Sequence, residues 1–217
     1  MGQIYQGVNI NNIIKEFKIK NFIETGTGIG DSLSFMIKFE ELNLYSIELM
    51  DELYEELIKK FKNENNIKLI KGFSTKELKK LLNIISTDPT VFWLDAHFPG
   101  ADFAIRNLGY DSQIDNSIRL PLEHELTVIS KSNRNIKNDI IVIDDLRIYK
   151  DGPYEGGVWG ERATLGGTNI TFVKELFIST HNIYESYKQQ GYIILIPKWY
   201  KGDCSDLILG TYKSILF

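Results

Sequence analysis

Residues 22–33 read FIETGTGIGDSL, a short apolar segment that runs straight into a loop with glycine at every second position. Gly26, Gly28 and Gly30 carry no Cβ and tolerate positive φ, so a ligand can approach the main chain and the N–H groups that open a following helix. A dinucleotide-binding loop has the pattern G-x-G-x-x-G, whose last glycine would fall on Asp31. The segment predicts a strand, a loop that binds a cofactor other than a dinucleotide, and a helix. A glycine-rich turn of purely structural use is the alternative.

The composition indicates one globular domain that binds no nucleic acid. The 217 residues are 43% hydrophobic and 25% charged, with a net charge of −4. An acidic chain lacks the basic face that a phosphate backbone requires. The single cysteine, Cys204, excludes an internal disulfide and a cysteine-rich zinc site, which fits a reducing compartment. No segment has the pattern of a secretion signal or the roughly 20 apolar residues of a membrane span, so we expect a cytoplasmic protein.

Short apolar runs alternate with segments at helical spacing, which predicts an α/β fold with a mostly parallel sheet and helices on both faces. Strands are expected at 21–24, 42–47, 67–70, 91–94 and 140–143, and helices at 11–17, 31–39, 51–61 and from Ser74 and Pro121 onward. Ser74 and Glu77 have the spacing of a capping box. After a helix near 170–189, the strands 191–197 and 207–212 follow each other without a helix between them and are expected to be antiparallel.

Two long segments, 96–120 and 146–168, follow strand ends and show neither strand nor helix periodicity. Both are expected over the carboxyl edge of the sheet, where open α/β folds bind their ligands. Loops of this length are uncommon unless they are functional or disordered. Side chains in them that suit stacking on, and hydrogen bonding to, an acceptor are Asp102, Arg106, Tyr110, Asp111, Arg147, Tyr149, Tyr154, Trp159 and Arg162.

Glu48 ends the second predicted strand, about 20 residues past the glycine loop, where an acidic side chain can accept hydrogen bonds from ribose hydroxyls. Both S-adenosylmethionine (SAM) and NAD use such a group, and a solvated strand-end carboxylate is the alternative. The segment Glu24 to Gly30, E-x-G-x-G-x-G, resembles the first motif of class I SAM-dependent methyltransferases.

The resemblance implies a Rossmann-like fold with a mostly parallel seven-stranded sheet that ends in an antiparallel pair. It also implies that Glu24 holds the methionine part of SAM and that the turn after the third strand contacts the adenine. Many members of the family carry Asp where this chain has Phe73, so an aromatic or backbone contact to the adenine is the alternative here. The cofactor-binding residues expected on this basis are Glu24, Thr25, Gly26, Thr27, Gly28, Gly30, Asp31, Ser32, Glu48, Gly72, Phe73, Ser74 and Asp95.

The segments 92–97, FWLDAH, and 142–145, VIDD, carry the candidate chemistry. In the family's strand order the fourth and fifth strands are neighbours, so Asp95, Asp144 and Asp145 would meet beside His97. Three crowded carboxylates repel one another unless a cation lies among them, and oxygen ligands suit Mg²⁺ or Mn²⁺. The arrangement is similar to that of metal-dependent O-methyltransferases that act on sugars of antibiotics and glycans, which implies that these three residues hold the metal. Many of those relatives have Asp-Gly-Asp where this chain has Asp-Ala-His.

Methyl transfer from SAM requires a hydroxyl that loses its proton, and a metal lowers the pKa of a bound hydroxyl. We expect His97 to be the base, with Asp95 also catalytic, since an imidazole titrates near neutral pH. His97 as a metal ligand or as a group that orients a carboxylate is the alternative, and His124 is a reserve base. The predicted acceptor is a sugar hydroxyl, such as that of rhamnose, in a small molecule or glycan, with a homo-oligomer possible.

Three other functions remain open. The first is O-methylation of a catechol or small phenol, which also presents neighbouring oxygens. The second is an NAD-dependent oxidoreductase or epimerase, against which Asp31 counts. The third is a non-catalytic SAM- or nucleotide-binding module, which the acidic residues Asp95, Asp144 and Asp145 disfavour.

Overall fold

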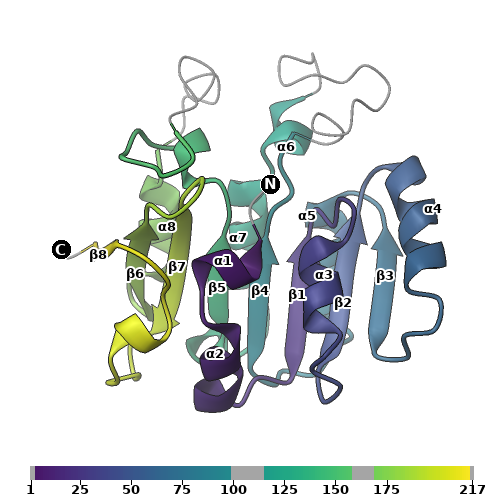
Figure 1. The fold of residues 1–217 in the computed structure, drawn as a ribbon, viewed down its shortest axis with the longest axis horizontal. Helices are drawn as coiled ribbons and strands as arrows, with labels where there is room; N and C mark the ends of the chain where they lie inside the picture. Colours follow the sequence, from purple (N-terminus) through teal and green to yellow (C-terminus); the bar gives the residue numbers. More distant parts are fainter. Residues whose placement is uncertain (1–2, 99–114, 158–168, 216–217) are drawn as a thin grey trace.

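The computed structural model describes residues 3–98, 115–157 and 169–215. Its centre is one eight-stranded sheet with the order β3-β2-β1-β4-β5-β7-β6-β8 (Figure 1). The strands are β1 (Asn21–Thr25), β2 (Asn43–Glu48), β3 (Ile67–Lys71), β4 (Thr90–Leu94), β5 (Ile140–Ile143), β6 (His181–Ser186), β7 (Tyr192–Pro197) and β8 (Tyr212–Ser214). The first five are parallel, whereas β7, β6 and β8 add antiparallel strands at one end. The predicted class is confirmed, and β8 makes eight strands where seven were expected.

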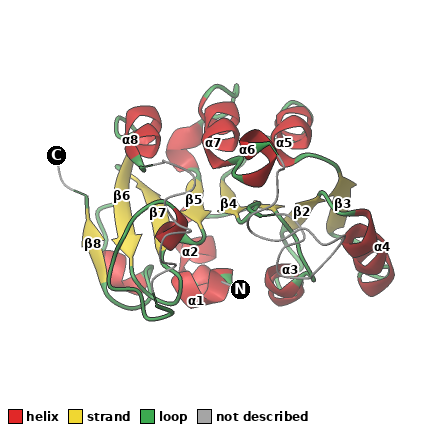
Figure 2. Ribbon diagram, turned by 90° about the horizontal axis from the view of Figure 1, so that it is seen from above, coloured by secondary structure: helices red, strands yellow, loops and turns green. Residues whose placement is uncertain are grey.

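Helices cover both faces of the sheet (Figure 2). One face carries α1 (Ile4–Gly7), α2 (Ile10–Phe17), α3 (Asp31–Met36) and α4 (Asp51–Lys60), and the other carries α5 (Ser74–Leu82), α6 (Asn116–Arg119), α7 (Leu122–Ser130) and α8 (Thr171–Phe177). Successive strand residues face opposite layers, so Phe92 joins the core under α7 while Trp93 joins the core under α2. This double burial explains why β5 is apolar at every position and β4 is apolar at every position after Thr90.

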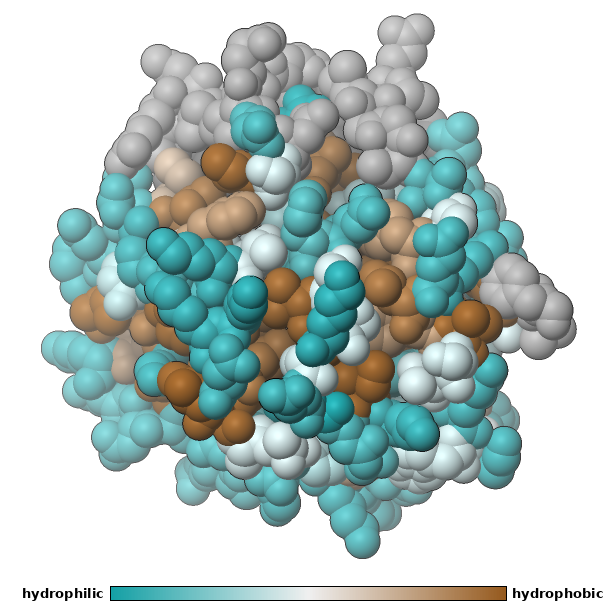
Figure 3. Space-filling model, turned by 180° about the vertical axis from the view of Figure 1, so that it is seen from behind, coloured by the Kyte–Doolittle hydropathy of each residue, from teal (hydrophilic) through white to brown (hydrophobic). Residues whose placement is uncertain are grey.

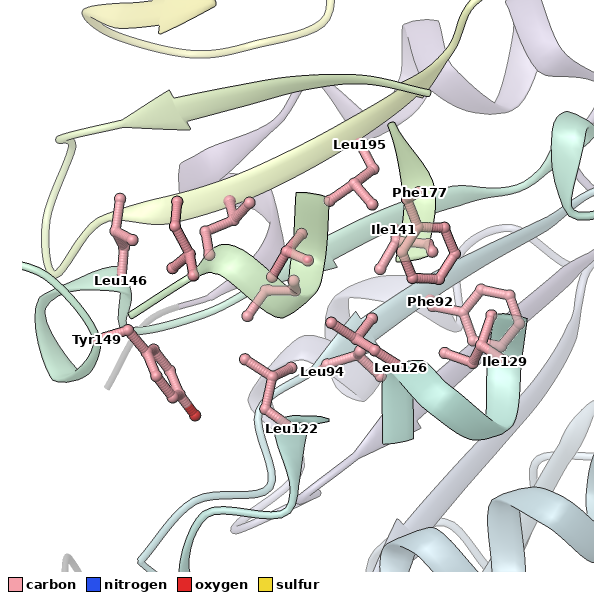
Figure 4. Packing of buried hydrophobic residues seen from close by; sticks show 14 of the residues in the cluster. Phe92, Leu94, Leu122, Leu126, Ile129, Ile141, Leu146, Tyr149, Phe177 and Leu195 are labelled. Carbon is pink, nitrogen blue, oxygen red and sulfur yellow. The ribbon is translucent and has the colours of Figure 1, made fainter. Parts of the chain in front are cut away.

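The core beneath α7 and α8 is packed closely (Figure 4). Phe92 and Leu94 of β4 lie beside Leu126 and Ile129 of α7. The outer face of this layer is mixed, with hydrophilic side chains between smaller hydrophobic areas (Figure 3). Among the described residues, no helix is both long and apolar enough to span a bilayer.

The predicted helix at 170–189 is wrong beyond Phe177. Residues His181–Ser186 form β6, which pairs antiparallel with β7 and buries Ile183 against the core. The hairpin partner of β7 is therefore β6 and not the predicted strand 207–212. Leu207 and Ile208 are buried beneath the N-terminal segment, where Ile208 makes an isolated bridge to Val8, and β8 begins only at Tyr212. Tertiary pairing overrides the local helical pattern here.

The capping box predicted at Ser74 is also wrong. Phe73 is the N-cap of α5, and no side chain accepts a hydrogen bond from the first turn. Ser74 is the first helical residue and is buried, with its Oγ making no hydrogen bond. Glu77 turns outward to Lys80, at 2.7 Å. The serine therefore faces the protein interior instead of closing the helix.

Candidate functional site

The glycine loop brings the ends of β1 and β4 together. Gly26 has φ +77°, and a Cβ there would lie 2.5 Å from the carbonyl oxygen of Asp95. Gly30 also has φ +77°, but a Cβ there would meet Leu57 at 2.7 Å, so part of the glycine pattern serves helix packing. Gly28 donates its backbone N–H to Glu48 Oε2 at 2.9 Å. The loop is thus fixed against β2, at the carboxyl ends of the parallel strands (Figure 1).

Glu24 is buried at the end of β1 and accepts a hydrogen bond from the Ser46 hydroxyl, which also lies 2.6 Å from Thr27 Oγ1. Burial raises the pKa of Glu24 to about 8, against the opposing effect of the Ser46 hydrogen bond. A carboxyl of this kind is mostly protonated at neutral pH. A cationic ligand beside it would stabilise the ionised form.

Glu48 is buried at the end of β2, so the alternative of a solvated carboxylate is wrong. Burial raises its pKa, although the backbone N–H groups of Met50 and Gly28 oppose the shift. Its Oε1 accepts from Met50 at 2.7 Å. A carboxylate oxygen has two acceptor sites, so each oxygen can accept one further hydrogen bond from a ligand hydroxyl.

A small pocket that is open to solvent lies between the glycine loop, Glu24 and Asp95. Asp31 and Ser32 from the start of α3 line it, and so does Gln3 from the N-terminal segment. Ser32 donates to Gln3 Oε1 at 3.1 Å. Gln3 was not predicted, because nothing in the local sequence marks a polar residue that reaches the site from a distant segment.

Asp95 follows β4, and Asp144 and Asp145 follow β5, which pairs with β4 as predicted. The ring of His97 lies between two of them, with Nε2 2.8 Å from Asp145 Oδ2 and Nδ1 3.4 Å from Asp95 Oδ1. Arg147 donates its Nε–H to Asp145 Oδ1 at 3.1 Å. Asp145 therefore lies between the guanidinium of Arg147 and the imidazole of His97, and it adopts a left-handed backbone with φ +53°.

The charges of the other two carboxyls, Asp95 and Asp144, are less well compensated by neighbouring groups. Burial, and then the nearby Asp144, raise the pKa of Asp95 well above its usual value. Burial, and then Asp145, raise the pKa of Asp144 to about 7, and its Oδ1 is buried without a hydrogen-bond partner. Within the described ranges, no group of three or more His, Cys, Asp or Glu side chains is arranged to hold a metal ion. The acidic residues are therefore neighbours, but their oxygens do not converge on one point.

The other predicted site residues are distributed unevenly. Gly72 lies at the turn after β3 with φ +145° and donates to Glu48 O at 2.9 Å, so this turn adjoins the glycine loop. His124 is exposed on α7. Tyr149 and Tyr154, expected to contact an acceptor, are instead buried in the core, where the Tyr154 hydroxyl donates to Lys150 O at 2.7 Å. The predicted acceptor contacts Asp102, Arg106, Tyr110, Asp111, Trp159 and Arg162 lie outside the described residues.

Two buried polar side chains near the acidic residues were also missed. The Tyr192 hydroxyl at the start of β7 makes no hydrogen bond, and its phenol pKa is raised by burial and then by Asp144. Glu125 is 1% exposed on α7. A signal for Glu125 exists in the sequence, since it occupies the i+3 position after Leu122, on the face that buries Leu126 and Ile129. A carboxylate on the inner face of a helix is a candidate functional group.

Solved structures share this arrangement of strands and helices. A protein from Staphylococcus aureus described as a caffeoyl-CoA O-methyltransferase matches with a TM-score of 0.56 at 13% identity, covering 87% of this chain and 80% of that one. The chain has an O-methyltransferase fold. An O-methyltransferase from Bacillus cereus in complex with SAH matches with a TM-score of 0.52 at 13% identity, over 87% and 79% of the two chains.

A protein from Klebsiella pneumoniae described as an O-methyltransferase gives a TM-score of 0.51 at 12% identity, over 87% of this chain and 77% of that one. No protein-family model and no curated protein sequence matches the chain. At these identities the likeness establishes the fold, so the activity has to be argued from the chain's own residues.

Proposed function

We propose that the protein is a SAM-dependent O-methyltransferase. The observation that carries the proposal is the set of acidic side chains that line the pocket beside the glycine loop. Its lining includes Glu24, Asp31 and Asp95, and among the residues that the structure describes no lysine or arginine lines it. A carboxylate-rich wall favours the ammonium and sulfonium groups of SAM and repels the pyrophosphate of NAD.

Glu48 supports the same orientation of the cofactor. It lies beside the loop, fixed by Gly28, where it can accept hydrogen bonds from a ribose. We assign Glu24, Thr27, Ser32 and Gln3 to the methionine end and Glu48 to the ribose. When bound, SAM supplies the electrophilic methyl group.

We propose further that Asp95 and Asp144, with Asp145, hold a divalent ion such as Mg²⁺ or Mn²⁺. The donor set fits such an ion in its chemistry: all three donors are carboxylates, their charges repel, and Asp144 Oδ1 has no partner. When bound, the ion would lower the pKa of an acceptor hydroxyl. Asp145 would take part less readily, because Arg147 already neutralises it and His97 Nε2 contacts its Oδ2.

His97 is the proposed base. Asp145 Oδ2 fixes Nε2 at 2.8 Å and stabilises the imidazolium that forms when the ring takes a proton. The longer contact of Nδ1 to Asp95, 3.4 Å, makes Nδ1 the nitrogen that can turn toward a hydroxyl. If the ring keeps both contacts throughout the reaction, its role is to orient the carboxylates.

The acceptor remains a sugar hydroxyl in this proposal, with a catechol as the second candidate. Both present neighbouring oxygens to a metal. Tyr149 and Tyr154 are buried, so two of the aromatic side chains expected to stack on a sugar are not placed to do so. The site therefore supports methyl transfer more strongly than it supports a sugar as the acceptor.

The test is transfer of a labelled methyl group from SAM to a panel of sugars and catechols, with and without EDTA. We expect transfer to at least one class, abolished by EDTA and restored by Mg²⁺ or Mn²⁺. Transfer that is undiminished by EDTA would refute the metal proposal. SAM binding without transfer to either class would favour the non-catalytic binding module.

A further inference from the structure

The indole ring of Trp199 is half exposed at the amino edge of the sheet. Trp199 is 50% exposed and follows β7, which ends at the same edge as α2 (Figure 1). Its Nε1–H donates to the carbonyl oxygen of Lys137 at 2.8 Å, and its ring centroid lies 5.4 Å from that of Phe17. These two contacts hold the ring in one orientation and pair its polar group. The ring therefore offers a ligand an apolar aromatic surface.

Exposed lysines gather around this ring. The segments 15–20 and 198–201, together with the residue that accepts the indole hydrogen bond, contribute six of them: Lys15, Lys18, Lys20, Lys137, Lys198 and Lys201. Lys18 directly follows Phe17 and Lys198 directly precedes Trp199, so both side chains start next to the paired rings. Within the described ranges, none of the six makes an ion pair. We call the ring and these lysines the Trp199 patch.

The acidic residues that adjoin the patch do not cancel its charge. Burial and then Glu16 raise the pKa of the Tyr200 phenol, and Asp206 and Asp203 add to the shift. These three carboxylates therefore lie around Tyr200, which is itself only partly exposed. The six lysines outnumber them, although the chain as a whole carries a net charge of −4. The patch thus differs in sign from the rest of the protein and favours an anionic ligand.

Three kinds of partner fit this combination poorly. A two-fold contact with a second copy of the chain would place the same lysines against one another. A tryptophan at a membrane interface keeps its N–H at the level of the polar headgroups, whereas that of Trp199 is bonded to Lys137 O. Single-stranded nucleic acid stacks successive bases on several rings and carries a charge on every unit, whereas Phe17 is buried and the whole chain is acidic.

We propose that the Trp199 patch binds an acidic oligosaccharide, a sugar chain that carries carboxylate groups. The C–H groups on one face of a sugar ring are apolar and weakly positive, so they pack on the negative face of a fixed indole. The lysine ammonium groups stand on long, flexible side chains and pair with carboxylates spaced along the sugar chain. The patch lies at the edge opposite the glycine loop, so this binding goes beyond methyl transfer and does not depend on it (Figure 1).

The experiment is calorimetric titration of the protein, without SAM and at low ionic strength, with hexagalacturonate and with the neutral maltohexaose. We expect hexagalacturonate to bind at least about 10-fold more tightly, with an affinity that falls as salt is added. Trp199→Ala should weaken its binding about 10-fold, because the apolar contact is lost. Ile58→Ala removes an apolar side chain that is 46% exposed on α4 and should leave the affinity unchanged.

A double variant, Lys18→Glu with Lys198→Glu, tests the charge of the patch and carries the test alone should Trp199→Ala not fold. It should weaken hexagalacturonate binding about 10-fold or more, because both side chains are exposed and the charge is reversed. The matched control is Lys59→Glu with Lys79→Glu, two exposed lysines on α4 and α5, which should bind as the wild type does.

Several outcomes would overturn the inference. They are no binding of hexagalacturonate, equal binding of maltohexaose, and an affinity that the double lysine variant leaves unchanged. Tighter binding of oligothymidylate or of phosphatidylglycerol vesicles would assign the patch to nucleic acid or to a membrane surface instead. Methyl transfer is not measured in any arm, so a failure of the proposed function and a failure of this inference are seen in separate experiments.

Discussion

The two edges of the sheet hold buried charges in opposite ways. At the amino edge, Asp139 precedes β5 and accepts from Arg134 Nε at 3.0 Å and from the Thr90 backbone N–H at 3.0 Å. Arg134 also donates to the carbonyl oxygens of Ser86 and Asp88, at 3.1 and 2.8 Å. At the carboxyl edge, carboxyls crowd together, and Asp144 Oδ1 and Glu125 Oε1 make no hydrogen bond.

This difference distinguishes buried charges that stabilise the fold from buried charges that bind a ligand. A buried ion pair whose hydrogen bonds are all made is compatible with a stable core, whereas unpaired buried carboxyls cost stability. Proteins keep such groups where a ligand completes them, so departures from a fully satisfied interior gather at functional sites. On this view the amino edge supports the fold and the carboxyl edge binds cofactor and acceptor.

The largest expected effect comes from breaking the amino-edge ion pair. Arg134→Ala leaves Asp139 buried without its cation and should lower the free energy of unfolding by about 3 to 5 kcal/mol. Urea unfolding followed by circular dichroism measures the change. SAH affinity of the folded fraction should stay the same. An unfolding free energy equal to that of the wild type would remove the structural role assigned to this edge.

The second effect is the pH dependence of stability from His181, which is buried at the start of β6 with Nε2 3.0 Å from Asp139 O. Burial lowers its pKa to about 4, below the ordinary value of 6.5. Between these values the unfolded chain binds more protons, so stability should fall by about 3 kcal/mol as the pH drops from about 6.5 to about 4. Above about pH 6.5 the contribution of His181 to stability is constant.

Chemical denaturation across the pH series checks this effect, with His181→Gln as the comparison. The glutamine amide can still donate to Asp139 but does not titrate. A slope in the variant as steep as in the wild type would assign the pH dependence to other groups.

The third effect contrasts one carboxylate at each edge. Asp144→Asn should reduce methyl transfer roughly 100-fold or more, since a metal ligand is lost. It should leave stability unchanged or raise it by about 1 kcal/mol, because it removes a repelled charge. Asp139→Asn should lower stability and leave methyl transfer by the folded protein unchanged, because it leaves Arg134 with a neutral partner. Loss of both SAH binding and stability in Asp144→Asn would show that this residue belongs to the fold instead.

Much of the fold follows from local sequence. The strand 140–143 has the predicted bounds, and β1 and α3 begin at the predicted residues, Asn21 and Asp31. The proximity of Asp95 to Asp144 and Asp145 follows from the pairing of β4 with β5, which the family resemblance implied. Such features are predictable because apolar runs and glycine turns act within a few residues of each other.

The remainder depends on contacts between distant segments. β6 was predicted as helix, because its strand character comes from pairing with β7. Gln3 reaches the pocket by hydrogen bonding to Ser32, 29 residues away in sequence. Ser74 had the spacing of a helix cap, yet it faces Glu125, which only the packing of α5 on α7 reveals.

The most direct test of the central claim is calorimetric titration of the wild-type protein with SAH and with NAD⁺ under the same conditions. The carboxylate-lined pocket beside Gly26 and Glu24 predicts one SAH per chain and no measurable binding of NAD⁺. Binding of NAD⁺ in the absence of SAH binding would contradict the assignment of this edge to a methyl donor.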